Sequence, residues 1–252
     1  MTFYILCKNE AANIRKCLTH LIASNMHVVV LDSGSTDETL EIVREFPVEL
    51  RSYRYTNHCN AYNEITNYAK EGYCGILDAD MELTSDLAQE ILQIRGSYDV
   101  LISPIKMYVD GLALEQGNLC PPKPIVFKYG KSYFESVGHG ERLVHGLNIG
   151  YTQAVLPHND LKPYISFLGS QLRYAENFIA RSKNKQLTWR DKLRLKTPLL
   201  ILIVPLYSLF IKGGIFNKQG WLYAIDRLIA EAIMYRWSVI DKINKTKNKS
   251  NI

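Results

Sequence analysis

Acidic side chains follow short apolar runs at two places in this chain of 252 residues. Asp32 comes directly after Val28–Leu31, and the pair Asp78 and Asp80 comes directly after Cys74–Leu77. Two carboxylates at i and i+2 that leave a strand together can hold one hard divalent cation through oxygen, with a diphosphate filling the open coordination positions. The pattern therefore predicts metal-assisted binding of a nucleotide. Two solvated carboxylates in an ordinary turn would give the same short motif.

The first hundred residues alternate short apolar runs with helical patterns, which is typical of βαβ units. In an open α/β sheet, the loops at the carboxyl ends of the strands converge and bind ligands there. The predicted fold class is therefore α/β, with a mostly parallel central sheet. Ser35 and Glu38 predict a capping box at the start of the helix after the second strand. We expect strands at 3–7, 28–31, 48–52, 74–77 and 99–103, helices at 14–22 and 60–69, and only strand and loop from 108 to 156.

Other nucleotide-binding and metal-binding classes lack their motifs in this chain. Neither G-x-G-x-x-G nor G-x-x-x-x-G-K-[ST] occurs, which disfavours a Rossmann dehydrogenase and a P-loop NTPase. The five cysteines lie at least ten residues apart and cannot form a C-x-x-C zinc or redox pair. We expect them to be reduced, as in a cytosolic protein, and the first residues show no basic region typical of a secretory signal.

Several segments together resemble the family 2 glycosyltransferases, which have a GT-A fold. The main ones are Ile5–Glu10, continued by Asn13–Leu18, then Val30–Thr39 and Leu77–Asp80. Two weaker ones, similar to a bacterial branch that builds lipopolysaccharide or other surface glycans, are Leu156–Pro163 and Gln171–Glu176. The resemblance implies a nucleotide-sugar-binding, Rossmann-like domain followed by C-terminal amphipathic helices. It also implies transfer of a sugar from a nucleotide sugar, UDP-linked in particular, with inversion.

The resemblance also implies roles for individual residues. Asp32 corresponds to the carboxylate that hydrogen-bonds the nucleotide base, and Glu10 to one near the ribose. Asp80 corresponds to the ligand of Mg²⁺ or Mn²⁺, and Asp78 to its partner in the D-x-D pair on the ribose side; the metal would offset charge on the leaving UDP. An alternative for Asp32 is a turn carboxylate that caps the next helix. The other nucleotide-sugar contacts implied are Cys7, Asn9, Ser33, Gly34 and Ala79.

Inverting transfer needs a base that takes the proton from the acceptor hydroxyl. The resemblance makes Glu141 the first candidate and Asp160 the second. Related enzymes carry a His–Glu pair at about this place, whereas Gly140 separates His139 from Glu141 in this chain. This departure keeps open a non-catalytic nucleotide-sugar-binding protein, and a nucleotidyltransferase is the other alternative.

Three further side chains have both a ligand-binding and a structural interpretation. His158 is a candidate for the metal shell or the diphosphate, and equally for a hydrogen-bonded structural histidine. Lys162 and Arg173 are candidates for phosphate contacts, and equally for solvated surface cations.

The overall charge of +5 conceals two oppositely charged parts. Residues 1–160 carry 13 Lys and Arg against 20 Asp and Glu, a net −7, whereas residues 161–252 carry 17 against 5, a net +12. A basic region on an acidic body favours an anionic partner, and the uncharged segment Pro198–Ile211 favours a membrane over nucleic acid. This segment is too short to span a bilayer, which needs roughly 20 apolar residues in a helix.

The predicted organisation is a GT-A domain over residues 1–180 and a helical membrane-associating region over residues 181–252. Peripheral contact is expected through residues 181–243, where cations at 181–196 precede the apolar segment and an amphipathic helix covers Trp221–Ile243. The alternative is that the apolar segment packs on this helix as a core. The expected location is the cytoplasmic, inner face of the cell membrane, with a lipid-linked or lipopolysaccharide acceptor and no nucleic acid partner.

Overall fold

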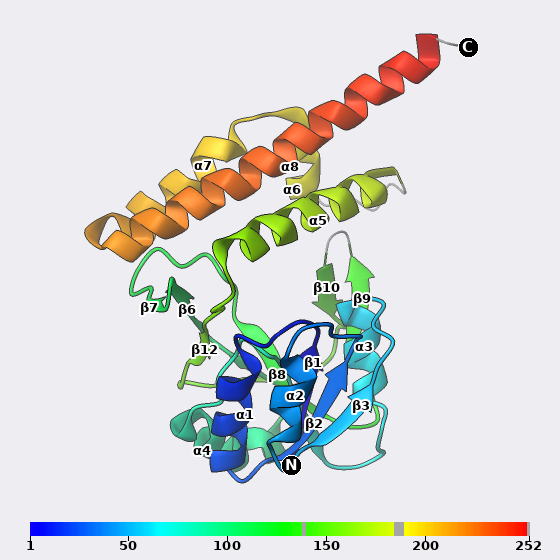
Figure 1. Ribbon diagram of the computed structural model, residues 1–252, viewed down its shortest axis with the longest axis vertical. Helices are drawn as coiled ribbons and strands as arrows, with labels where there is room; N and C mark the ends of the chain where they lie inside the picture. The colour runs from blue at the N-terminus through cyan, green and yellow to red at the C-terminus, as the bar shows by residue number, and fades with distance from the viewer. Residues whose placement is uncertain (138–139, 184–188, 251–252) are drawn as a thin grey trace. The chain divides into compact units, whose positions relative to one another are not determined.

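The computed structural model describes residues 1–137, 140–183 and 189–250 (Figure 1). The chain forms two compact units. The first comprises Met1–Ala113, Cys120–Glu135 and Arg142–Lys162. The second comprises Leu114–Leu119, a short segment at 136–141 and the chain from Pro163 onward. The functional division expected at residue 180 stays a prediction.

A seven-stranded sheet forms the centre of the first unit, in the order β11-β5-β8-β4-β1-β2-β3. Its neighbouring strands are parallel except for β8, which lies antiparallel between β4 and β5. The predicted α/β class with a mostly parallel central sheet is therefore confirmed. The strands are β1 (Thr2–Cys7), β2 (His27–Asp32), β3 (Glu49–Ser52), β4 (Tyr73–Asp78), β5 (Val100–Ser103), β8 (Lys123–Lys128) and β11 (Ile149–Tyr151).

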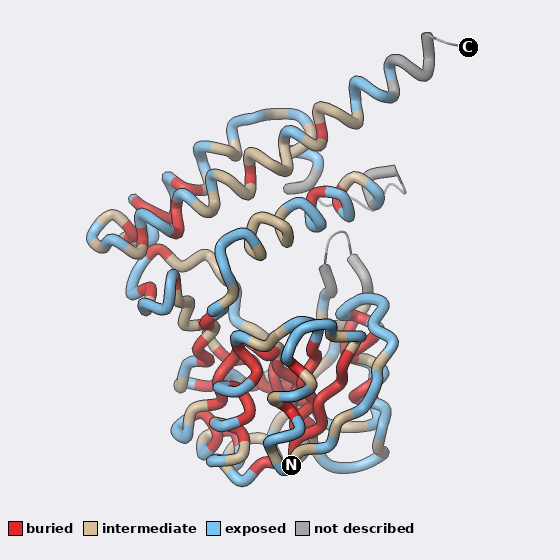
Figure 2. Tube along the Cα trace, in the orientation of Figure 1, coloured by how far each residue is buried: buried red, intermediate tan, exposed pale blue. Residues whose placement is uncertain are grey.

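Helices cover both faces of this sheet, so its central strands are buried (Figure 2). Strand β1 shows the alternation that this requires. Phe3 and Ile5 belong to the buried cluster that contains α1, α2 and α4, whereas Tyr4 and Leu6 belong to the cluster that contains α3. The sheet is thereby a rigid platform for the loops at its carboxyl edge. The helices are α1 (Ile14–Ala23), α2 (Thr39–Arg44), α3 (His58–Ile65) and α4 (Ser85–Ile94), the last followed by a 3₁₀ turn (Arg95–Ser97).

The helix after β2 begins later than the capping box predicts. Helix α2 starts at Thr39, and its N-cap residue Glu38 makes no side-chain capping hydrogen bond. Ser35 instead donates its hydroxyl to the Asp32 carboxylate at 2.5 Å, while the Asp37 carboxylate accepts the Thr39 amide at 3.1 Å. The capping-box prediction is wrong because the Ser35 hydroxyl binds the Asp32 carboxylate and does not cap the helix.

Residues beyond β5 form several short strands that the sequence does not resolve. The helix expected at 60–69 is also displaced: α3 covers His58–Ile65 because Asn57 caps it, accepting the Asn60 amide at 2.9 Å. A bridge between Met81 and His158 places the end of β12 beside the loop after β4. The short strands are β6 (Ile105–Val109), β7 (Leu112–Ala113) and β12 (Leu156–His158) in one small sheet, and β9 (Phe134–Val137) and β10 (Gly140–Leu143) in another.

Helices make up most of the second unit. The amphipathic helix expected at Trp221–Ile243 is confirmed within α8, and α7 continues through Pro205 into a π-helical turn at Tyr207–Ile211. Within the part of the chain that the structure describes, none of the helices combines the length and the hydropathy needed to cross a membrane. The helices are α5 (Tyr164–Lys183), α6 (Trp189–Lys196), α7 (Leu200–Leu206) and α8 (Lys218–Ser250), with a 3₁₀ turn at Gly214–Phe216.

Candidate active site

The carboxyl ends of β1, β2 and β4 bring the acidic motifs to one edge of the sheet. Cys7 pairs with Asp32 in the register of β1 and β2, and Leu6 pairs with Asp78 in the register of β1 and β4. Because these strands are adjacent and parallel, the loops that follow them start side by side. The polar residues that follow these three strands, Glu10, Asp32 and Asp78 with Asp80, therefore gather at one edge of the sheet.

Asp32 holds the turn that follows β2. Its carboxylate accepts the Gly34 amide at 2.9 Å, the Ser35 amide at 3.1 Å and the Ser35 hydroxyl at 2.5 Å. Gly34 has φ +86°, a left-handed conformation that glycine adopts without strain. Asp32 is thus a buried turn carboxylate, but it does not cap α2. Its contact with a nucleotide base stays a prediction.

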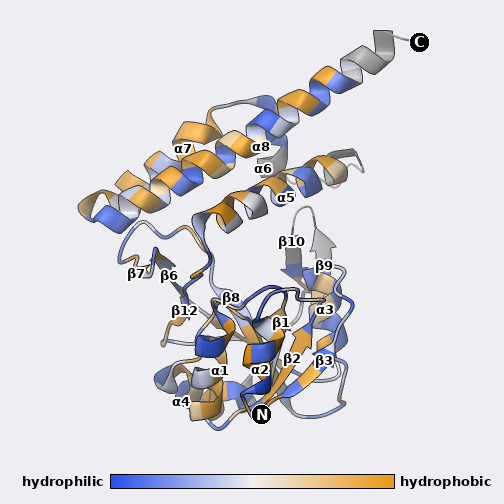
Figure 3. Cartoon of the chain, in the orientation of Figure 1, coloured by the Kyte–Doolittle hydropathy of each residue, from blue (hydrophilic) through white to orange (hydrophobic). Residues whose placement is uncertain are grey.

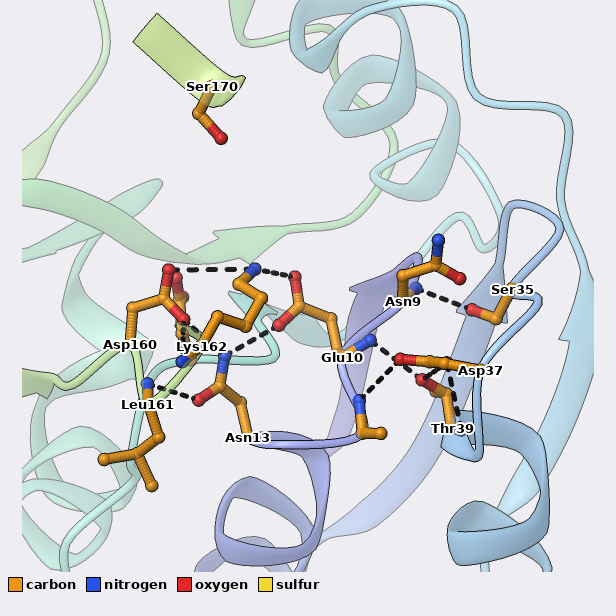
Figure 4. Close-up of polar contacts among 12 residues, drawn as sticks. Asn9, Glu10, Asn13, Ser35, Asp37, Thr39, Asp160, Leu161, Lys162 and Ser170 are labelled. Atoms are coloured by element: carbon orange, nitrogen blue, oxygen red, sulfur yellow. Dashed lines mark hydrogen bonds and ion pairs between the residues drawn. The ribbon is translucent and has the colours of Figure 1, made fainter. Parts of the chain in front are cut away.

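Asn9 joins the loop after β1 to this turn (Figure 4). Its backbone amide donates to the Ser35 hydroxyl at 2.8 Å, and its side-chain oxygen accepts the Thr36 amide at 2.7 Å. The Ser33 amide adds a bond to the Cys7 carbonyl at 2.9 Å. Burial raises the pKa of the Cys7 thiol, so this side chain is neutral and forms part of the wall beneath the loops.

Glu10, Asn13, Asp160 and Lys162 form a connected polar cluster, drawn in Figure 4. Glu10 accepts from Lys162 Nζ at 2.7 Å and from Asn13 Nδ2 at 2.8 Å. Asn13 Nδ2 also donates to Asp160 Oδ1 at 2.8 Å, and Asn13 Oδ1 accepts the Leu161 amide at 2.8 Å. Asn13 is only 2% exposed, and these bonds fasten the loop after β12 to the loop after β1.

The members of this cluster differ in how accessible their side chains are to a ligand. Burial raises the pKa of Glu10, against the opposing effect of the Lys162 hydrogen bond, and both Glu10 oxygens already have protein partners. Lys162 is a paired cation, so its interpretation as a solvated surface cation is wrong. The Asp160 side chain is 40% exposed, against 15% for Glu10, and is the more accessible carboxylate. Arg173 belongs to the second unit, where it donates to the Ser170 hydroxyl at 2.8 Å.

Asp78 forms an ion pair with Lys123, the first residue of β8. The Asp78 side chain is 29% exposed and that of Lys123 is 19% exposed. Burial raises the pKa of Asp78, but the charge and hydrogen bond of Lys123, together with the charges of His58 and His158, outweigh it and lower this pKa to about 2. Because β8 runs antiparallel to β4, its first residue lies at the edge where β4 ends. Asp78 is therefore ionised beside a cation that the protein itself supplies.

Asp80 pairs with His158, whose Nε2 lies 3.0 Å from Asp80 Oδ2. Burial lowers the pKa of His158, but hydrogen bonds with Asp80 and Cys120 and the charges of Asp80 and Asp78 together outweigh it and raise this pKa to about 10. The contact with Asp80 thus favours the protonated imidazole, and the role of His158 as a metal ligand stays a prediction. The structure places His158 as a hydrogen-bond donor to Asp80, and the Asn159 amide supports the same loop through the Asp80 carbonyl at 2.9 Å.

A divalent cation fits beside Asp80. The Oδ1 atom of Asp80 is buried and has no hydrogen-bond partner among the described residues, and a carboxylate oxygen is a preferred ligand of Mg²⁺. In the parts of the chain that the structure covers, no three His, Cys, Asp or Glu side chains gather into a metal-binding group. Ala79, between the two aspartates, is buried in the core beneath them. A bound ion would therefore be held by Asp80, with Asp78 beside it, and take its other ligands from a diphosphate and water.

We expect the free energy of unfolding of the metal-free protein to fall as the pH rises from 6.5 to about 10. The pKa of His158 is raised in the folded state, so its protonation contributes full stability below 6.5 and loses it as the pH passes through about 10. Urea unfolding followed by circular dichroism across this range measures the trend. His158→Gln should flatten the profile, and an unchanged profile in this variant would assign the titration to another group.

Of the two candidate bases, the structure describes the side chain of Asp160 but not that of Glu141. Glu141 lies in β10, its side chain is outside the described residues, and so are Gly138 and His139. Asp160 lies in the cluster with Asn13 and Lys162. The choice between them as base stays a prediction.

Sequence reasoning missed the roles of Lys123 and Asn13. Lys123 begins an antiparallel strand in the region where no periodicity is readable, and its partner Asp78 is 45 residues away. Asn13 stands at the N-cap of α1 but makes no capping hydrogen bond from its side chain. An asparagine at a helix start is usually interpreted as the helix cap. The bonds of the Asn13 side chain to Glu10, Asp160 and Leu161 were therefore not expected.

Relatives of this chain carry glycosyltransferase names. The SPbeta prophage-derived glycosyltransferase SunS of Bacillus subtilis (strain 168) and the glycosyltransferase SunS of Bacillus phage SPbeta are each 28% identical to it over 152 residues. The matched region covers 57% of this chain and 36% of each relative. The chain thus spans little more than a third of the length of these curated relatives.

Solved structures that are similar to the chain include S. aureus TarS 1-349, with 15% identity, a TM-score of 0.43, and coverage of 96% of this chain and 91% of that one. Another is glucosyl-3-phosphoglycerate synthase from Mycobacterium tuberculosis in complex with Mn²⁺, UDP and glucosyl-3-phosphoglycerate, with 14% identity, a TM-score of 0.36, and coverage of 42% and 43%. The model of the family described as Glycosyl transferase family 2 matches residues 2–137, more than half of the chain. This span contains Asp32 and the D-x-D pair, and the chain belongs to glycosyl transferase family 2.

Proposed function

We propose that the chain transfers a sugar from a UDP-sugar, with inversion and with Mg²⁺ or Mn²⁺, to a lipid-linked or lipopolysaccharide acceptor. Membership of glycosyl transferase family 2 gives the general reaction and leaves the nucleotidyltransferase alternative without support. The observation that carries the finer proposal is the D-x-D pair at the end of β4. There Asp80 keeps one buried carboxylate oxygen that has no hydrogen-bond partner among the described residues.

The charges around this pair suit a diphosphate leaving group. A bound metal would supply Lewis-acid stabilisation of the leaving UDP. The cations of the protein fix the positions of the carboxylates before a nucleotide arrives, as outer hydrogen bonds do for ligands in many metal sites. The pairs that do so are Lys123 with Asp78, His158 with Asp80, and Lys162 with Glu10.

The acceptor hydroxyl would lose its proton to Glu141 or Asp160 as it attacks the anomeric carbon. Asp160 is held through Oδ1 by Asn13, and its exposed side chain can face an incoming hydroxyl. Glu141→Gln and Asp160→Asn distinguish the two, because loss of the base should stop transfer while UDP affinity stays near its original value.

We also propose peripheral contact with the cytoplasmic, inner face of the cell membrane through residues 181–243, where a lipid-linked acceptor would lie. The net charge of +12 over residues 161–252 supports an anionic surface as the partner. Exposed apolar side chains of α7 and α8, such as Leu202 and Ile225, support contact with lipid.

Calorimetric titration with UDP, GDP, CDP and ADP, each with and without Mn²⁺, tests the proposed donor. We expect binding that is selective for UDP and dependent on the metal, and slow release of UDP when a UDP-sugar is supplied. Selective binding of another nucleotide would change the donor. Failure of all four to bind would favour the non-catalytic alternative.

A further inference from the structure

Helix α7, the π-helical turn Tyr207–Ile211 and the start of α8 form a helical hairpin within the second unit. Its turn contains Gly213, at φ +77°. Gly220 in α8 packs on Gly214 so closely that a Cβ on Gly220 would lie 2.0 Å from the Gly214 carbonyl oxygen. Part of the hairpin is buried within the second unit, where the Ser208 hydroxyl donates to the Gly117 carbonyl at 2.6 Å. Its buried residues include Pro205, Ser208, Leu209, Tyr223 and Ala224.

Both arms of this hairpin are rich in apolar residues (Figure 3), and several of these are exposed. In α7 and the residue before it, the exposed side chains form a stripe with the spacing i, i+3, i+4 and i+7, which marks one side of a helix. It is formed by Leu199, Leu202, Ile203 and Leu206. The stripe of α8 has the spacing i, i+1, i+4 and i+7 and is formed by Trp221, Leu222, Ile225 and Leu228.

The turn between the arms is the most exposed part. Phe210 is 59% exposed, Ile211 is 69% exposed and Phe216 is 84% exposed. We call the two stripes and these three side chains the hairpin face. The alternative in which the apolar segment is only a core explains the buried side chains but not the exposure of the hairpin face. An apolar patch of this extent marks an interaction site.

The charge around the hairpin face selects the partner. Residues 199–228, which carry the hairpin face, contain three Lys and Arg and one acid, Asp226, and the exposed Lys212 and Lys218 flank the turn. Asp226 already accepts the Tyr164 hydroxyl at 2.8 Å, and a twofold contact with a second copy would bring the lysines of the two turns together. A bilayer with anionic headgroups offers phosphate to the lysines and acyl chains to the apolar side chains.

We propose that the turn of this hairpin enters the boundary between headgroups and acyl chains of an anionic bilayer. Phe210, Ile211 and Phe216 insert most deeply, the stripes lie along the surface, and Lys212 and Lys218 contact lipid phosphates. This inference rests on the membrane association proposed above and narrows it from residues 181–243 to residues 199–228.

Vesicle sedimentation with the full chain tests this assignment. We expect binding to phosphatidylcholine vesicles that contain phosphatidylglycerol and weaker binding to phosphatidylcholine alone. Phe210→Ser with Phe216→Ser should weaken binding by at least tenfold, since two exposed apolar side chains leave the bilayer. Lys212→Gln with Lys218→Gln should remove most of the preference for phosphatidylglycerol.

The matched control is Leu92→Ser with Leu112→Ser. These side chains are 43% and 56% exposed, and they lie in the first unit, outside residues 181–243. Their replacement should leave vesicle binding unchanged.

If the hairpin variants bind vesicles as well as the original chain, the inference is wrong and the broader membrane association stands. If the original chain does not bind vesicles, both fail, while nucleotide titration still reports on the donor site. A lipid-free dimer that Phe210→Ser with Phe216→Ser dissociates would identify a second copy as the occupant and overturn the proposal.

Trp221 provides an independent measure of depth. The chain has three tryptophans, so Trp189→Phe with Trp237→Phe leaves Trp221 as the single fluorophore. Its emission should shift to shorter wavelength on vesicles and be quenched by lipids brominated near the headgroup end of the acyl chain. Absence of quenching in a bound protein would place the contact elsewhere.

Discussion

Asp80→Asn should abolish metal-dependent binding of UDP and lower kcat/KM for sugar transfer by about 100- to 1,000-fold. The substitution removes the negative charge and keeps the shape of the side chain. The bond to His158 Nε2 can still form with the amide oxygen, so the loop after β4 should keep its position. What is lost is the charge on Oδ1, the buried oxygen that has no hydrogen-bond partner in the described structure. Calorimetric titration with Mn²⁺ and UDP, together with steady-state assays, measures both effects.

Asp110→Asn is the matched control for this substitution. Asp110 is exposed in a turn and has φ +50°, a conformation that asparagine also tolerates. It removes the same charge from the first unit without touching the D-x-D pair, and should leave binding and turnover unchanged. Metal-dependent UDP affinity in Asp80→Asn within twofold of the original chain would refute the assignment of Asp80.

Lys123→Met should lower the free energy of unfolding by about 3 kcal/mol at neutral pH. Removal of the ammonium leaves the mostly buried Asp78 carboxylate without the partner that keeps its pKa at about 2. An uncompensated buried charge costs more than the ion pair itself contributes. Chemical denaturation followed by fluorescence measures the loss.

Two comparisons separate this effect from a general loss of a surface charge. Lys131→Met breaks an ion pair of 2.6 Å with Asp99, but Lys131 is 47% exposed, so the expected loss is below about 1 kcal/mol. Lys123→Met combined with Asp78→Asn should regain most of the stability, because the uncompensated charge is gone. Equal losses in Lys123→Met and Lys131→Met, or no recovery in the double variant, would contradict the proposed role of Lys123.

The strands among the first hundred residues could be predicted because each is a local apolar run, whereas helix α4 was not predicted. The run Val28–Leu31 is a continuous apolar segment, and it lies in a buried strand, β2. The same holds for Cys74–Leu77 and β4. Adjacent parallel strands then place Asp32, Asp78 and Asp80 at one edge without further information.

The partners of these carboxylates could not be predicted, because they depend on long-range pairing. Strand β8 enters the sheet antiparallel, and nothing near Lys123 in the sequence indicates that its side chain meets Asp78. The sequence makes His158 a candidate ligand. Its hydrogen bond to Asp80 could not be predicted, because it depends on the long-range bridge between Met81 and His158. The capping box at Ser35 was predicted wrongly for a related reason. The Ser35 hydroxyl binds the Asp32 carboxylate and therefore does not cap the helix.

The order in which charges appear along the chain has a consequence for how the first unit folds. The acids at the carboxyl edge belong to the first 80 residues, whereas their cations follow by 45, 78 and 152 residues in the pairs Asp78 with Lys123, Asp80 with His158, and Glu10 with Lys162. A nascent chain therefore exposes these carboxylates before any of the three cations has been synthesised. Because burying an unpaired carboxylate is unfavourable, this edge should stay hydrated until β8 and β12 dock. Closing loops of this length is slow compared with local pairing. The D-x-D edge would then be among the last parts of the unit to become ordered during synthesis.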